Sequence, residues 1–147
     1  MNLIDSLEKT RDQTILYFDL EDEFLIKTYA PGKWNIKQIL HHLADAETVL
    51  YERLRRVISE PKQVIWGFNQ DLWCDALDYD KMPLLLSKNI YAAVRENVIY
   101  LVKEHYFTKG DLPFVHSETG MKTLRDEMEK VAWHNERHLK QIEQALS

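Results

Sequence analysis

The sequence predicts an all-α protein, a four-helix bundle, from three observations. Apolar residues recur with helical spacing in four stretches, the glycines and prolines fall between those stretches, and no stretch alternates apolar and polar residues as a strand does. A chain of 147 residues, 45% of them apolar and 29% charged, is long enough to bury a normal core. We therefore expect one helical-bundle domain over residues 1–147.

Two helices are predicted in the first 60 residues. The first continues irregularly to Tyr29 and is ended by Pro31 and the glycine after it. Its inward positions are Leu3, Leu7, Thr14 and Tyr17. The second begins after Asn35, a good helix N-cap, and extends to about Ser59, before Pro61. Its apolar stripe consists of Ile39, Leu43, Ala46, Leu50, Leu54 and Val57.

Two more helices are predicted in the second half of the chain. The third begins with Pro83 at its first position and extends to about Tyr106. Its inward residues are Leu84, Tyr91, Val94, Val98 and Leu101. The fourth follows Gly120, with Thr123 as N-cap. Its inner stripe is Leu124, Met128, Val131, His134, His138 and Ile142.

The connection between the second and third helices is unusually long. It exceeds 20 residues, which indicates a crossover rather than a tight turn, so the bundle need not alternate up and down. Four of its aromatic residues are Trp66, Phe68, Trp73 and Tyr79. One interpretation is packing over an end of the bundle, and the other is a lid or wall for a site.

Three histidines are the candidate metal ligands. His134 and His138 are four residues apart and therefore lie on one helix face. His42 lies beside the apolar stripe of the second helix, whereas His41 points about 100° away and is expected in solvent. Three imidazoles would form a site for a divalent transition metal (zinc, nickel or iron) with open positions for water or substrate.

Two polar residues could orient these imidazoles. Gln141 follows His138 by three residues on the same face, and Asp45 lies on the polar flank of His42, so each could hold a ring by a hydrogen bond. The plainer alternative is that an inward histidine is a hydrogen-bonded core residue and that the pair arose by chance. Spacing alone leaves both interpretations open.

Other potentially reactive residues give weaker signals. A zinc-protease motif is excluded because Asn135, not glutamate, follows His134. His105 and His116 are treated as structural, with His116 as an alternative residue at the mouth of the site. Cys74 is a lone thiol for which no matched base is evident, so we do not expect it to be catalytic.

Composition excludes several functional classes. A formal net charge of −5 argues against a sequence-independent nucleic-acid binder, which needs a basic face. No apolar run approaches the roughly 20 residues that span a bilayer, so we expect no membrane partner. One cysteine and the absence of a signal-like N-terminus favour a cytoplasmic protein. Phosphate-binding and dinucleotide-binding motifs are absent.

Two motifs resemble those of the DinB/YfiT-like superfamily. The segment GKWNIKQILHHLADAE at residues 32–47 is similar to the family's tryptophan-led helix start and histidine-leucine signature. The segment WHNERHLKQI at residues 133–142 is similar to its closing histidine pair. Residues 120–124 and 69–73 also look familiar, so the resemblance spans nearly the whole chain.

The resemblance implies a four-helix bundle with up-down-down-up topology and a long crossover between helices two and three. It also implies a homodimer and a metal held by His42, His134 and His138, the same residues that the spacing indicates. Family members with an established activity are mostly transferases or isomerases that use bacillithiol, mycothiol or glutathione.

The leading functional hypothesis is therefore metal-dependent S-transfer of a low-molecular-weight thiol to a small electrophile. An anionic thiol would need a basic residue near the site, and the candidates are Lys33 and Arg137. The alternatives are a metal-dependent hydrolase of a small amide or ester and a non-catalytic, metal-binding stress-response module.

Overall fold

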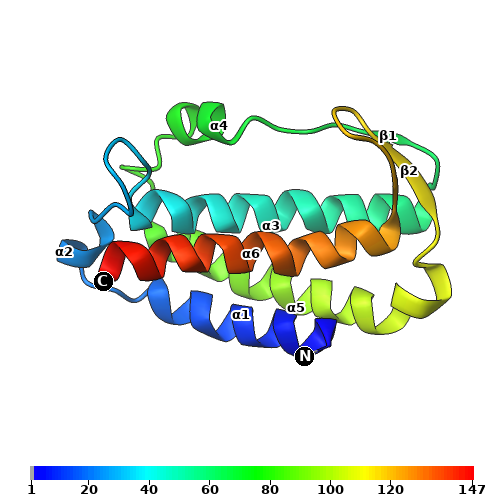
Figure 1. Ribbon diagram of the computed structural model, residues 1–147, viewed down its shortest axis with the longest axis horizontal. Coiled ribbons are helices and arrows are strands. Elements are labelled where there is room, and N and C mark those ends of the chain that lie inside the picture. Colours follow the sequence, from blue (N-terminus) through cyan, green and yellow to red (C-terminus); the bar gives the residue numbers. More distant parts are fainter. Residues whose placement is uncertain (1) are drawn as a thin grey trace.

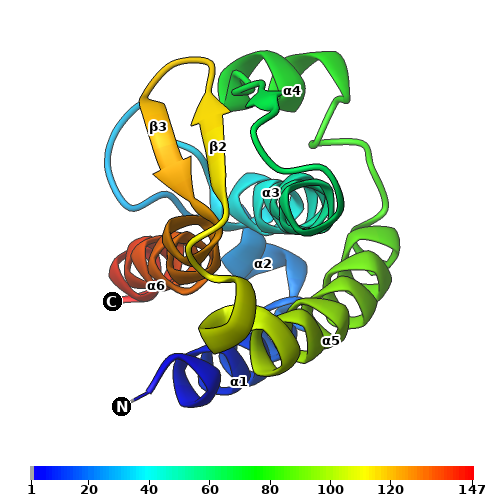
Figure 2. The same cartoon turned by 90° about the vertical axis from the view of Figure 1, so that its right-hand side faces the viewer.

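The computed structural model describes residues 2–147, and four long helices that lie side by side form its main body (Figure 1). They are α1 (Leu3–Tyr17), α3 (Ile36–Ser59), α5 (Leu84–Lys109) and α6 (Leu124–Leu146). In Figure 2, α3 packs against α5 and α6, and α1 contacts the same two helices from the opposite side. The predicted four-helix bundle is confirmed. Within the described residues, no helix combines the length and apolarity needed to cross a membrane.

The helices run up, down, down and up, as the resemblance implied. In Figure 1, α1 and α6 point one way, whereas α3 and α5 point the other. Since α3 and α5 are parallel, the chain between them must return along the whole bundle. This crossover contains β1 (Val64–Ile65) and α4 (Gln70–Ala76), and in Figure 1 it passes above α3.

Both predicted N-caps of the site-bearing helices are present. The Asn35 side chain accepts a hydrogen bond from the backbone N–H of Gln38, whose side chain accepts one from the backbone N–H of Asn35. Thr123 and Asp126 make the same reciprocal pair at the start of α6. Each pair satisfies two backbone donors that a helix end would leave unbonded, and so fixes where α3 and α6 begin.

The N-terminal helix is shorter than predicted, because α1 ends at Tyr17 and a separate turn of helix, α2 (Asp22–Leu25), follows. The backbone N–H groups of Asp19 and Leu20 bond to carbonyls three residues earlier, which tightens and ends α1. The turn brings the buried Phe18 and the buried Leu25 into one apolar cluster with α3.

A small sheet was not predicted. β1 pairs in parallel with β2 (Pro113–His116), which pairs in antiparallel with β3 (Gly120–Thr123). Gly120 has φ of +85°, which favours glycine, and it begins the strand that leads directly into α6. Strands of two to four residues are too short for the alternation of apolar and polar residues to be visible in sequence.

The core consists of two apolar clusters separated by a polar layer. One cluster includes Leu54, Val98 and Met128, and the other includes Leu40, Tyr91 and Ile142. Along each long helix, buried polar residues lie between the positions that belong to the two clusters. They are Thr10 and Thr14 of α1, Glu47 of α3, Arg95 of α5, and Asn135 and His138 of α6, and the buried His42 lies between one and two turns before Glu47 on α3.

Candidate metal centre

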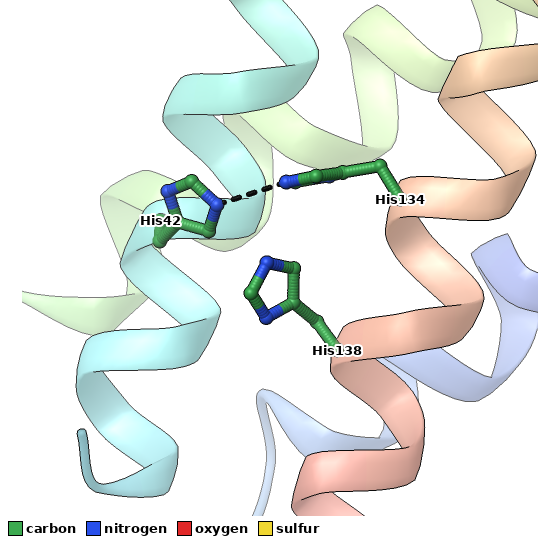
Figure 3. A group of neighbouring side chains, drawn as sticks. All are labelled: His42, His134 and His138. Carbon is green, nitrogen blue, oxygen red and sulfur yellow. Dashed lines mark hydrogen bonds between the residues drawn. The ribbon is translucent and has the colours of Figure 1, made fainter. Parts of the chain in front are cut away.

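Three imidazoles converge at the α3–α6 side of this polar layer. His42 comes from α3, and His134 and His138 come from successive turns of α6 (Figure 3). One ring nitrogen of each lies within 4.8 Å of the others, and the Nε2 atoms of His42 and His134 are 3.0 Å apart. The structure thus brings together the three histidines that the spacing singled out.

The donor set fits a divalent transition metal. Two imidazole nitrogens bound at about 2.05 Å to a tetrahedral ion lie about 3.4 Å apart. This separation is between the 3.0 Å that separates the Nε2 atoms of His42 and His134 and the 4.8 Å within which all three nitrogens lie. A metal ligand must be a neutral imidazole. Burial, with a smaller contribution from His138, lowers the pKa of His42 to about 3. Burial and the neighbouring His138 and His42 lower that of His134 to about 2. Burial also lowers the pKa of His138.

Gln141 occupies the position predicted for an orienting partner. Its Oε1 lies 2.7 Å from Nδ1 of His138, and an amide oxygen can only accept, so Nδ1 carries the hydrogen. The lone pair of His138 is then on Nε2. This hydrogen bond fixes the tautomer and the ring orientation in the way that second partners of metal-binding histidines do.

Asp45 does not contact His42 as expected. Its Oδ2 accepts a hydrogen bond from the hydroxyl of Tyr79, a residue of the crossover, and Nδ1 of His42 has no hydrogen-bond partner within residues 2–147. The crossover supplies the reason, because it places a buried phenol next to the carboxylate, and the sequence pattern could not show this.

The expectation that His41 is solvated is wrong. His41 is 0% exposed, with Nε2 3.0 Å from the carbonyl oxygen of Met82 and Nδ1 2.6 Å from the hydroxyl of Ser87. Its ring also stacks on Tyr79. The helix face that points away from the α6 side is covered by α5 and by the end of the crossover. His41 is thus a core histidine whose two nitrogens both have partners.

The remaining candidates lie outside the triad. His105 is half-buried on α5. His116 is buried at the end of β2, with its Nδ1 bonded to backbone N–H groups. Cys74 is buried in α4, and burial raises the pKa of its thiol, which favours the unreactive protonated form.

Aromatic rings enclose His42. The Trp34 ring centroid lies 5.1 Å and the Phe68 centroid 6.2 Å from the His42 ring, and Phe68 in turn packs on Trp73 at 4.8 Å. The crossover therefore supplies part of the wall of the site as well as covering the bundle. Phe68 agrees with the interpretation of the crossover aromatics as a wall, whereas Trp34 was predicted only as part of the helix-start motif.

A cavity of about 440 Å³ opens onto His134 and His138. Its lining also includes the basic residues Lys33 and Arg137 and the acidic residue Asp71. The two basic residues named from the sequence are therefore both at the site, on different elements. Asp71 belongs to the motif at residues 69–73, whose link to the site the sequence did not reveal.

The chain matches the model of the DinB superfamily over residues 6–142. Two proteins of Oceanobacillus iheyensis, each named "Putative metal-dependent hydrolase", are similar to it. One is 33% identical over 128 residues, covering 87% of this chain and 73% of the relative. The other is 30% identical over 142 residues, covering 97% and 81%.

Among solved structures, YfiT from Bacillus subtilis matches with a TM-score of 0.87 and 22% identity, over 96% of this chain and 82% of that protein. It is described as "a probable metal-dependent hydrolase with an unusual four-helix bundle topology". At this identity the match establishes the shared fold. The family model covers nearly the whole chain, and the protein therefore belongs to the DinB superfamily.

Proposed function

We propose that His42, His134 and His138 hold one divalent transition metal and that the protein transfers a low-molecular-weight thiol to a small electrophile. The observation that carries this proposal is that two members of the triad, His134 and His138, line a cavity of about 440 Å³ that also holds two basic side chains. When bound, the metal would lower the pKa of a thiol or a water molecule and so supply a nucleophile at neutral pH. A cavity at the triad supports an enzyme over a non-catalytic module.

The protein's own residues set the conditions for this chemistry. Burial keeps the imidazoles neutral, and Gln141 directs the Nε2 lone pair of His138 toward the other two rings. Trp34 and Phe68 exclude water from one side of His42. Three protein ligands do not saturate a transition metal, so a position remains for an exogenous molecule.

Lys33 and Arg137 favour an anionic cosubstrate. Glutathione, the thiol used in the test below, carries carboxylates, and a guanidinium binds a carboxylate through two parallel hydrogen bonds. Arg137 also lies over the Trp133 ring, with its central carbon 5.7 Å from the ring centroid. The basic pair would orient the thiol while its sulfur reaches the triad.

Hydrolysis of a small amide or ester is the second candidate. It is favoured by the names of the relatives and by Asp71, a carboxylate in the same cavity that could accept a proton from water. The two candidates differ in one requirement, since only S-transfer consumes a thiol.

The test uses protein stripped with a chelator and reloaded with zinc, nickel or iron(II). Glutathione consumption is measured with a chloro-dinitrobenzene electrophile, and ester hydrolysis is measured without thiol. S-transfer predicts metal-dependent thiol loss, and removal of a charged contact in Arg137→Ala should raise the KM for thiol about tenfold. Lys140→Ala, an exposed residue on the same helix, is the control. Metal-dependent ester hydrolysis without thiol consumption would replace S-transfer by the second candidate.

Homodimer formation stays a prediction.

A further inference from the structure

A second cavity, of about 180 Å³, lies between His134 and the hairpin that β2 and β3 form. His134 lines both this cavity and the larger one, so the two spaces meet at its side chain. Ala46, Leu50 and Phe68 form apolar parts of its wall, whereas His116 and Lys130 contribute polar groups. A cavity of about 150 Å³ is large enough for benzene, so a compact organic molecule fits here.

His116 offers this cavity an unused hydrogen-bond donor. Its Nδ1 accepts hydrogen bonds from the backbone N–H groups of Glu118 at 3.1 Å and Thr119 at 3.3 Å. Since Nδ1 accepts, the hydrogen of the neutral ring is on Nε2. His116 is only 5% exposed, and no residue within 2–147 accepts a hydrogen bond from Nε2. His116 lines the cavity, so a ligand there could supply an acceptor for this free N–H.

A second unpartnered donor belongs to Arg53, which lines the same cavity. Its Nη1 is 3.5 Å from Glu127 and its Nη2 donates to the carbonyl of Trp66 at 2.9 Å, but its buried Nε has no partner in the part of the chain that the structure describes. The charges nearby balance, because Glu127 pairs with both Arg53 and Lys130, and the carboxylate of Glu118 also lines the cavity. Donors in excess at balanced charge suit a neutral oxygen acceptor better than an anion.

We infer that the 180 Å³ cavity binds the electrophile and that Nε2–H of His116 donates to its carbonyl oxygen. This assignment rests on the proposed S-transfer, and its substrate class is a small α,β-unsaturated carbonyl compound. The thiol sulfur forms a bond to the β-carbon, and the C=C electron pair moves toward the carbonyl oxygen, where His116 stabilises the charge. The thiol proton is released to solvent, and a solvent proton is added at the α-carbon, so the product is the thiol adduct.

The first test compares two small electrophiles, methyl vinyl ketone and allyl bromide, which lacks a carbonyl. His116→Asn is the variant, because an asparagine oxygen can still accept the backbone N–H two residues on while Nε2–H is lost. We expect kcat/KM for the ketone to fall at least about tenfold, with the bromide rate and metal content unchanged. The control is His105→Asn, in the half-buried histidine outside the site. Equal loss with both electrophiles, or no loss with either, overturns the assignment.

The second test needs neither a variant nor turnover. 2-Butanone, an unreactive analogue of the ketone, is titrated into metal-free wild-type protein while the ring nitrogen resonances of His116 are followed by NMR. We expect the Nε2 signal to shift and the shift to saturate as 2-butanone is added. If the signal does not shift, the assignment is overturned. Shifts without any thiol consumption would refute the proposed S-transfer and leave the carbonyl site standing, so the two failures are distinguishable.

Discussion

The polar layer of the bundle contains two groups of side chains that differ in their hydrogen bonding. In the centre, Arg95 donates to both carboxylate oxygens of Glu47 and to Oδ1 of Asn135. On the side of the layer where α3 faces α6, His42, His134 and His138 converge on one another. Asn135 directly follows His134 in sequence, so one turn of α6 contributes to both groups.

The difference between the groups is whether the polar atoms have partners. Arg95 is 0% exposed, and its remaining nitrogen, Nη1, bonds to the carbonyl of Leu7 and the hydroxyl of Thr10. In the histidine cluster, Nδ1 of His42 has no hydrogen-bond partner among residues 2–147, and the Nε2 atoms of His42 and His134 face each other. A satisfied network stabilises one packing of the helices, whereas buried atoms without partners are retained where a ligand completes them.

The largest expected difference between the groups is in acid. The pKa of His42 and that of His134 are lower in the folded chain, about 3 and about 2, than the ordinary histidine value of 6.5. Below pH 6.5 the unfolded chain therefore binds more protons, and the stability of metal-free protein should fall toward pH 4. The slope approaches about 1.4 kcal/mol per pH unit for each ring. Stability is fully present above pH 6.5.

Chemical denaturation of chelator-treated protein between pH 4 and 8 measures this slope. Burial is the main cause of both shifts, with His138 facing both rings and Lys130 and Arg137 also facing His134. His134→Gln should remove one ring's share of the slope. A slope that is unchanged in this variant would mean that the cluster does not cause the acid sensitivity.

Breaking the central group should be the next largest effect. Arg95→Ala leaves the Glu47 carboxylate buried without its partner, and loss of one member of a buried ion pair costs about 3–5 kcal/mol. Urea denaturation at pH 7 measures this loss. The double variant Arg95→Met with Glu47→Met should recover most of the stability, because no charge is left unpaired. If the double variant folds but no longer binds metal, the central group also positions the metal ligands, and the two groups do not have separate roles.

Replacing histidines should separate metal binding from stability. His134→Ala is expected to lose most of the bound metal while the bundle remains folded. His41→Ala should keep the metal but be less stable, because Ser87 and the carbonyl of Met82 lose their buried partner. Elemental analysis and thermal unfolding of both variants provide the readouts. Equal metal content in wild type and His134→Ala would remove the triad as the ligand set.

The sequence predicted the long helices well because each has its own local signals. Asn35 and Thr123 mark two helix starts, and Pro83 marks a third, within a residue of those observed. The strands were missed because the sheet joins residues about 50 apart in sequence, such as Val64 and Val115, through segments too short for periodicity.

For the site, helical spacing predicted which histidines meet but not what covers them. His41 and Asp45 were misplaced for the same reason, since Tyr79 of the crossover contacts both. The burial of Arg95 does have a signal in the sequence. Arg95 is four residues after Tyr91 and three before Val98, so it lies in the inward stripe of α5.

Removing the support of one ligand should have a smaller effect than removing the ligand. Gln141→Ala deletes the acceptor that holds Nδ1–H of His138, and loss of such a partner typically costs about 10–100-fold in metal affinity. Competition with a chromophoric chelator measures the affinity. Gln141→Glu, which keeps an acceptor in place, should retain most of it. An unchanged affinity in Gln141→Ala would show that packing alone orients His138.

The smallest effect on the metal is expected at Asp45, since its carboxylate bonds to Tyr79 and not to His42. Asp45→Asn and Tyr79→Phe should each cost about 1 kcal/mol of unfolding free energy, and together about as much as one alone, because both remove the same hydrogen bond. Metal content should equal that of wild type in all three variants. A metal affinity that falls in Asp45→Asn but not in Tyr79→Phe would instead restore Asp45 as a partner of His42. In that case metal binding would move the Asp45 carboxylate toward Nδ1 of His42, which has no hydrogen-bond partner within residues 2–147 in the metal-free structure.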